Sequence, residues 1–212
     1  MDTDRIDNKI FIPSDEEMKN QTALIGNYII CFEQISAFLR FIILKICYPD
    51  YSKTQNNNIE ILLEGLTADP LRKKLEALIY DNFPEEMELR KLNNELSKKF
   101  EKLIPIRNSI AHGSILVCYN GFDGELSSDT FLLKHSKATK TGIDRNSMII
   151  NLNSLQRLIS QTRQIDGAYS QLGVLIDKDI NEENKELHLN LLKEKIKKIG
   201  TIELEFEKKI TK

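Results

Sequence analysis

The chain has no tryptophan, only three cysteines and five prolines among its 212 residues. The cysteines are odd in number and lack metal-ligand spacing, which argues against a disulfide framework and a zinc site: Cys31, Cys47 and Cys118. The most apolar stretch, residues 24–47, is interrupted by charged side chains such as Glu33, so it does not read as a membrane span. The acidic N-terminus lacks the apolar segment of a signal peptide. We therefore expect a cytoplasmic protein with no membrane segment.

An excess of positive charge is also missing, because 30 basic residues are balanced by 32 acidic ones and the net charge is −2. This balance excludes a protein that holds nucleic acid by bulk charge, so any nucleic-acid site must be local. The apolar fraction of 41% and the charged fraction of 29% are ordinary for a globular domain.

Apolar residues recur at spacings of three and four along most of the chain, which predicts a mainly α-helical protein. Ser14 and Glu17 form a capping-box pattern that opens the first helix, and Asn153 is a plausible cap for a later one. Pro105 is expected to interrupt the fourth helix and bend it. The predicted helices cover residues 14–47, 59–66, 69–81, 85–112, 153–176 and 181–199.

Between residues 114 and 152 the spacing changes to period two, which predicts a small antiparallel β excursion. Its strands are expected at residues 115–119, 130–135 and 148–152. Residues 202–206 alternate apolar and acidic side chains and predict one more strand. The pattern indicates an up-and-down helical bundle over residues 1–178, followed by a C-terminal helix and strand extension over residues 179–212.

The segment from Arg107 to Gly113 carries most of the chemical information in the sequence. A histidine titrates near neutral pH and can move a proton, while an arginine binds phosphate and stabilises charge that develops on it. Asn108 can orient the histidine or bind a phosphate oxygen. On an ideal helix Asn108 and His112 lie about 40° apart, whereas Arg107 lies roughly 140° from His112. The long guanidinium can reach back, the Pro105 bend can rotate it, or two copies of the helix can meet so that each arginine completes the other's site. We favour the last arrangement, which predicts a homodimer with the motif at its interface.

The same residues also have a purely structural interpretation, in which a solvated arginine and a histidine end a helix and have no chemical role. The order Arg107, Asn108 and then His112 near a helix end resembles the signature of the HEPN (higher eukaryotes and prokaryotes nucleotide-binding) superfamily. The resemblance is specific over about seven residues of the motif. Over positions 14–178 it extends only to the order of the helices. It implies a HEPN-like bundle and a metal-independent endoribonuclease that leaves a 2′,3′-cyclic phosphate across a dimer. It also implies a toxin or antiviral defence setting with an antitoxin or defence partner protein.

Further residues are candidates for supporting roles. Asn27 and Glu33 fall in the first helix and are expected either to position Arg107 or His112 or, in the case of Glu33, to lie on the solvated face. A basic segment in the β excursion is a candidate RNA contact, with a solvated hairpin as its alternative: Lys134, His135, Lys137 and Lys140. No cofactor and no metal are expected. The alternative to a nuclease is a catalytically silent HEPN-like module that binds nucleotide or protein.

Overall fold

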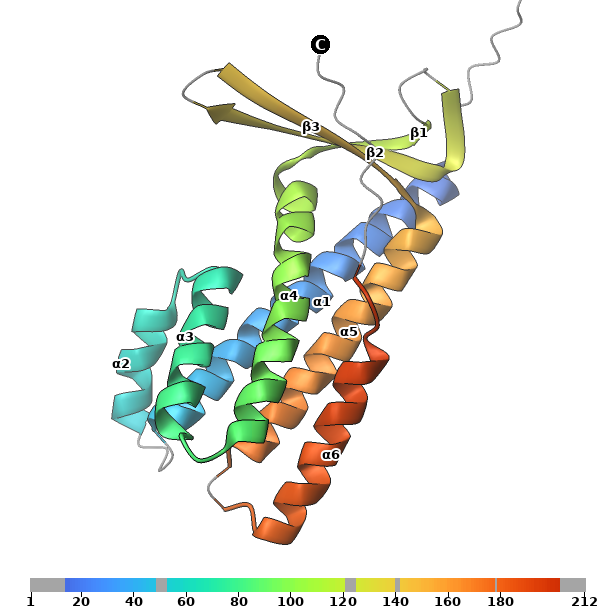
Figure 1. Cartoon of the computed structure of the whole chain (residues 1–212). Helices are drawn as coiled ribbons and strands as arrows, with labels where there is room; N and C mark the ends of the chain where they lie inside the picture. Colours follow the sequence, from blue (N-terminus) through green and yellow to red (C-terminus); the bar gives the residue numbers. More distant parts are fainter. Residues whose placement is uncertain (1–13, 49–52, 121–124, 140–141, 178, 203–212) are drawn as a thin grey trace, which may run out of the picture. The chain divides into compact units, whose positions relative to one another are not determined.

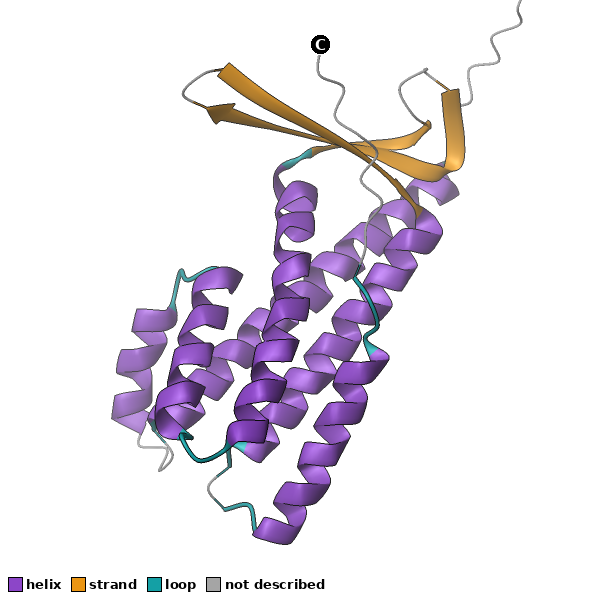
Figure 2. Ribbon diagram, in the orientation of Figure 1, coloured by secondary structure: helices purple, strands orange, loops and turns teal. Residues whose placement is uncertain are grey.

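The computed structural model describes residues 14–48, 53–120, 125–139, 142–177 and 179–202. Over these ranges the protein is mainly α-helical, with six helices and three strands (Figures 1 and 2). The helices are α1 (Asp15–Cys47), α2 (Lys53–Leu63), α3 (Ala68–Asn82), α4 (Met87–His112), α5 (Leu152–Leu175) and α6 (Glu182–Lys198). The strands are β1 (Ser114–Asn120), β2 (Glu125–Thr139) and β3 (Gly142–Asn151). None of the described helices is long and apolar enough to cross a bilayer.

The chain divides into two compact units, and the divide passes through α1, α4 and α5. Among the described residues, the sheet unit comprises the three strands with residues 14–26, 109–113 and 152–156. The helical unit comprises residues 27–108 and 157–202 in the described ranges. Helix α6 is grouped with the helical unit.

The sheet unit contains an antiparallel sheet in the order β1-β2-β3. Leu133 on the central strand lies opposite Ile115 on β1 and Met148 on β3, and it is buried. The strands are longer than the sequence pattern predicts, because pairing between β2 and β3 continues to Thr139 and Gly142. The additional strand predicted at residues 202–206 falls almost wholly outside the described residues and stays a prediction.

An aromatic series forms the centre of the helical unit and joins α1, α4 and α5. Ring centroids lie 6.5 Å apart for Tyr28 and Phe32, 5.2 Å for Phe32 and Phe100, and 5.9 Å for Phe100 and Tyr169. All four residues are at most 1% exposed, and each such pair typically adds about 0.5–1.5 kcal/mol beyond the area it buries. This series therefore fixes the part of α4 that leads to Arg107.

Polar contacts attach α6 to the same unit. Lys193 forms an ion pair with Glu88 at the start of α4 at 2.5 Å, while Leu192 and Ile196 are buried. Gly200 follows the helix with φ of 68°, a conformation that glycine adopts without the strain that a β-carbon would cause.

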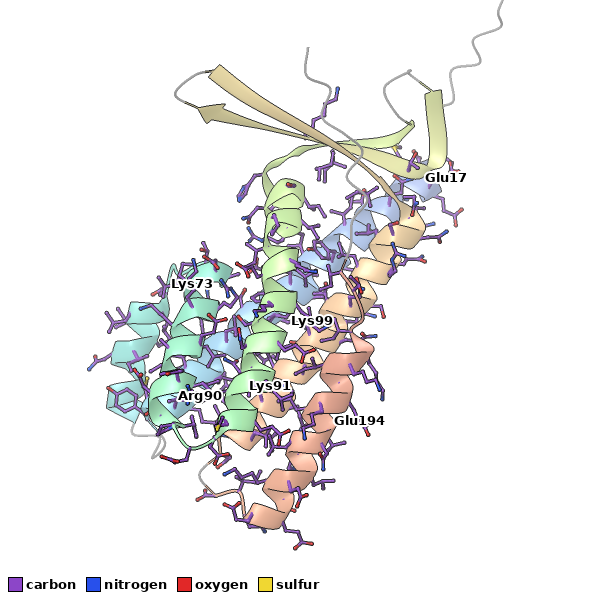
Figure 3. The ribbon with its side chains drawn as sticks, viewed as in Figure 1. Glu17, Lys73, Arg90, Lys91, Lys99 and Glu194 are labelled. Carbon is purple, nitrogen blue, oxygen red and sulfur yellow. The ribbon has the colours of Figure 1, made fainter. Side chains whose placement is uncertain are left out.

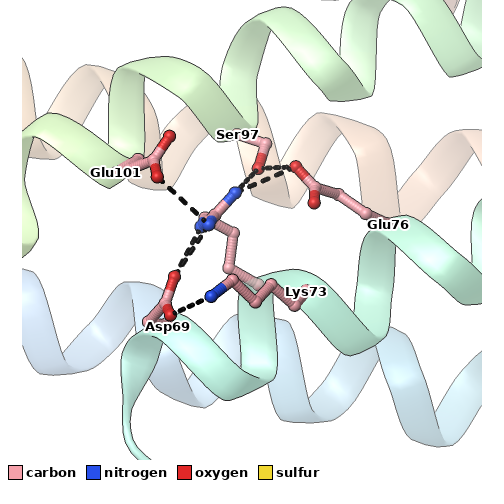
Figure 4. A network of polar contacts seen from close by, with 6 residues as sticks. Asp69, Lys73, Glu76, Ser97 and Glu101 are labelled. Carbon is pink, nitrogen blue, oxygen red and sulfur yellow. Dashed lines mark hydrogen bonds and ion pairs between the residues drawn. The ribbon is translucent and has the colours of Figure 1, made fainter.

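A buried arginine joins α3 to α4 within the helical unit (Figure 4). Arg72 is 5% exposed and donates to Asp69, Glu76, Ser97 and Glu101 at distances between 2.7 and 3.4 Å. Since a buried charge is tolerated only when it is paired, this network explains how an arginine fits between two helices.

Local side-chain chemistry sets several helix ends as predicted. The Ser14 backbone N–H and hydroxyl both donate to Glu17 Oε2, at 2.8 and 2.9 Å, and this confirms the capping box. Three predictions were wrong in detail. Helix α2 begins at Lys53 and not at residue 59. The α5 cap is Asn151, whose Oδ1 accepts from the Ser154 backbone N–H at 2.7 Å, and Asn153 lies inside the helix. Helix α4 runs through Pro105 without interruption.

Candidate functional site

The Arg-Asn and His residues all lie in the last six residues of α4. Pro105 does not end the helix, so Arg107 and Asn108 lie on the same helix that the aromatic series holds in place through Phe100. Asn108 and His112 are exposed, whereas the side chain of Arg107 is 25% exposed. The amide of Asn108 and the imidazole of His112 are thus each open to solvent, whereas the guanidinium of Arg107 is partly covered.

Glu33 on α1 holds this guanidinium, although 74 residues separate the two in sequence. Its Oε1 accepts from Arg107 Nε at 3.0 Å and from Arg107 Nη2 at 2.5 Å. Arg107 Nη1 lies 3.4 Å from Asn108 Oδ1, which makes a long contact within the motif itself. The Arg107 guanidinium carbon also lies 5.8 Å from the centre of the Phe32 ring, within the range of a cation–π interaction. Three neighbours therefore fix the direction in which Arg107 points.

This arrangement leaves donor capacity on Arg107. A guanidinium has five N–H groups, and Glu33 and Asn108 engage three of them. The remaining N–H groups on Nη1 and Nη2 suit two oxygens of one phosphate, because a guanidinium binds such anions in a bidentate manner. Helix α4 can therefore offer an oriented anion-binding group that is not saturated by its own protein.

Tyr28 lies within the electrostatic reach of this arginine. Burial raises the pKa of Tyr28 above its ordinary range, and the positive charge of Arg107 opposes that rise. The phenol stays protonated and donates to the backbone oxygen of Leu103 at 3.3 Å. Tyr28 thus acts as a support for α4 and does not supply a base.

Asn27 makes no hydrogen bond with Arg107. Its Oδ1 accepts from Cys31 Sγ at 3.4 Å and from Arg163 Nη2 on α5 at 3.2 Å. Of the two supporting candidates, Glu33 therefore contacts the motif, whereas Asn27 contacts α5. Neither Phe32 nor Arg163 was singled out from the sequence, where one fits the apolar stripe of α1 and the other is an ordinary charged helix residue.

His112 belongs to the sheet unit, whereas Arg107 and Asn108 belong to the helical unit. The backbone oxygen of Ser109 accepts from the Gly113 N–H at 2.8 Å, which closes the last turn of α4 next to the histidine. A β-carbon at Gly113 would lie 2.3 Å from that oxygen and 2.8 Å from Leu133 Cδ1. Glycine at this position is therefore explained by close packing against β2.

The basic segment lies on β2. Lys134 is exposed and pairs in register with Ser114 on β1 and Ser147 on β3. His135 stands opposite Asn146, and Lys137 stands opposite Asp144. Lys140 lies outside the described residues.

No cluster of three or more His, Cys, Asp or Glu residues suited to a metal ion occurs in the described ranges. Comparisons of the chain with protein-family models, with curated proteins and with solved structures find no match in any of the three.

Proposed function

We propose that the protein is a metal-independent endoribonuclease of the HEPN type, with Arg107 and His112 as its catalytic residues and Asn108 beside them. The observation that carries the proposal is the contact between Glu33 and Arg107. It holds an unsaturated guanidinium on the same helix end that bears an exposed histidine. The resemblance of the motif to HEPN ribonucleases supplies the reaction class.

In the proposed reaction His112 takes the proton of a ribose 2′-hydroxyl, and the 2′-oxygen attacks the adjacent phosphorus. The bond from phosphorus to the 5′-oxygen breaks, and the protonated His112 gives its proton to the departing oxygen. The products are a 2′,3′-cyclic phosphate and a 5′-hydroxyl. Arg107 stabilises the charge that builds on the phosphate oxygens during the attack.

A homodimer through α4 is part of the proposal, because on an ideal helix Arg107 and His112 lie about 140° apart around the axis. The setting that we propose is a prokaryotic toxin or antiviral defence system in the cytoplasm, with RNA as substrate and an antitoxin or defence protein as partner. Lys134 and its neighbours on β2 are the proposed backbone contacts.

One observation favours a different function. Glu33 partly neutralises Arg107, and an arginine paired in this way suits a catalytically silent module that binds nucleotide or another protein. In this alternative the ion pair is structural and His112 has no chemical role.

Replacement of His112 separates these functions. We expect expression of the wild-type chain to slow growth and fragment RNA, and the purified chain to leave cyclic phosphate ends in the presence of a chelator. His112→Ala should lower the cleavage rate by about 100-fold or more, the range that general acid–base catalysis provides.

His188→Ala is the matched control, because it removes a histidine on α6 that lies outside the motif. Its cleavage rate should stay near that of the wild type, and circular dichroism should show that both variants are folded. Equal growth and intact RNA for the wild type and His112→Ala would refute the nuclease.

A further inference from the structure

A pocket lies in the helical unit, between α3 and α4, at the opposite end of α4 from the motif. Its volume is about 490 Å³, within the range of about 300–1,000 Å³ that small-molecule sites occupy. Residues from both helices line it: Glu76, Ile79, Tyr80, Met87, Arg90, Lys91, Asn93 and Asn94. None of these residues takes part in the reaction proposed above.

One end of the pocket is aromatic and cationic. Arg90 lies over the Tyr80 ring, with 3.8 Å between the guanidinium carbon and the ring centre. Tyr80 is nevertheless 61% exposed, so the arginine leaves much of the ring open to a planar group. Lys91 is exposed and has no ion pair within the described part of the chain. Arg90 and Lys91 follow one another near the start of α4 (Figure 3).

The middle of the pocket carries two amides. Asn93 is only 3% exposed, yet its side chain makes no hydrogen bond with any other described residue. The Asn93 amide is not completely enclosed, and Asn93 lines the pocket. The small accessible area of this amide therefore faces the pocket. A buried amide without a partner is costly unless a ligand or water completes its hydrogen bonds. Asn94 is exposed beside it.

The other end carries a carboxylate. Glu76 Oε1 accepts from Arg72 at 3.1 Å and also from Ser97, as Figure 4 shows. Its Oε2 makes no hydrogen bond within the described ranges. Because Tyr80 follows Glu76 by four residues on α3, the two ends of the pocket lie about one helical turn apart, roughly 6 Å along the helix.

We propose that this pocket binds a nucleotide whose base carries an exocyclic amino group, with adenosine 5′-phosphate as the probe. The base stacks on Tyr80, its edge bonds to Asn93 and Glu76, and the phosphate binds Lys91. Asparagine pairs with the hydrogen-bonding edge of adenine, aromatic rings stack on bases, and a cation neutralises the phosphate. The proposal does not depend on the ribonuclease.

Calorimetric titration of the full chain with adenosine 5′-phosphate tests the site. We expect binding that Tyr80→Ala weakens by about 10-fold or more, since stacking contributes roughly 1–3 kcal/mol per base. Lys91→Gln should weaken binding of the nucleotide severalfold and leave binding of adenosine unchanged. Lys98→Gln is the matched control, because Lys98 is an exposed lysine two turns further along α4 and outside the lining.

The source of the nucleotide is decided by a second titration. A single-stranded adenylate trinucleotide, bound to the His112→Ala chain, should match the monomer if the ligand is a free nucleotide. It should bind at least 10-fold more tightly if the site takes one unit of an RNA strand. No binding of the monomer or the trinucleotide, or binding that Tyr80→Ala and Lys91→Gln leave unchanged, would overturn the proposal.

Discussion

One carboxylate oxygen of Glu33 accepts two N–H groups of Arg107, although the Glu33 side chain is 46% exposed. Exposed ion pairs contribute only about 0–1 kcal/mol to folding, so stability does not account for this contact. What it provides is direction, because it fixes the plane of the guanidinium and leaves N–H groups free. At the scale of a residue, Glu33 is therefore a positioning residue.

Glu33→Gln tests this role. We expect the cleavage kcat to fall about 10-fold, because a neutral amide holds the guanidinium less firmly and small displacements of a catalytic group are costly. The melting temperature should change by less than about 3 °C, as expected for loss of an exposed pair. Steady-state kinetics on a model RNA and a thermal melt give the two values.

Glu95→Gln is the control, because Glu95 is an exposed glutamate elsewhere on α4. It should leave both values unchanged. Faster cleavage by Glu33→Gln would contradict the positioning role and would show that the carboxylate masks Arg107 from phosphate.

The ends of the helices are set by side chains only a few residues away. At the start of α6, Asn181 Oδ1 accepts from the Asn184 backbone N–H at 2.8 Å, and at the start of α5 Asn151 does the same for Ser154. Asn151 also ends β3, so one residue closes the sheet and opens the helix. At this scale a cap is a local hydrogen bond whose loss has a known cost.

Asn151→Ala should destabilise the protein by about 1 kcal/mol, because the first turn of α5 loses the acceptor for its N–H. Asn153→Ala, the neighbouring exposed position inside the helix, should change stability by less than about 0.5 kcal/mol. Urea unfolding followed by circular dichroism measures both. Equal losses for the two variants would assign the cap to the wrong asparagine.

At the scale of the whole molecule, the divide between the two compact units separates Asn108 from Ser109. The phosphate-binding and proton-transferring groups that we propose therefore belong to different units. In the proposed dimer each site takes Arg107 from one protomer and His112 from the other, which makes activity a property of the pair.

Mixing two inactive variants tests the shared site. Arg107→Ala and His112→Ala should each be inactive as pure proteins. After joint refolding, half of the dimers combine one chain of each kind and carry one intact site of two, so about a quarter of wild-type activity should return. Light scattering checks that the variants remain dimers. The shared site would be refuted if the variants were monomeric, or if the refolded mixture were as inactive as each variant alone.

Much of the fold could be predicted because its determinants are local. The spacing of apolar residues and the Ser14 capping pattern lie within a few residues of the elements that they specify. The early start of α2 at Lys53 was missed, because its first turns are polar and carry no apolar period. For the site, the charge of Glu33 within an apolar stripe drew notice, but its pairing with Arg107 depends on how α1 packs against α4.

The close packing at Gly113 has a consequence for how inactivating mutations are interpreted. In a selection for survivors of a toxic chain, changes at His112 and at Gly113 would be recovered side by side, for unrelated reasons. The first removes a reactive group, while the second forces a β-carbon against Ser109 and Leu133. A smaller side chain at Leu133 would relieve only one of these contacts, because the Ser109 oxygen belongs to the backbone. The two classes of survivor therefore differ in whether the chain stays folded, which a thermal melt shows.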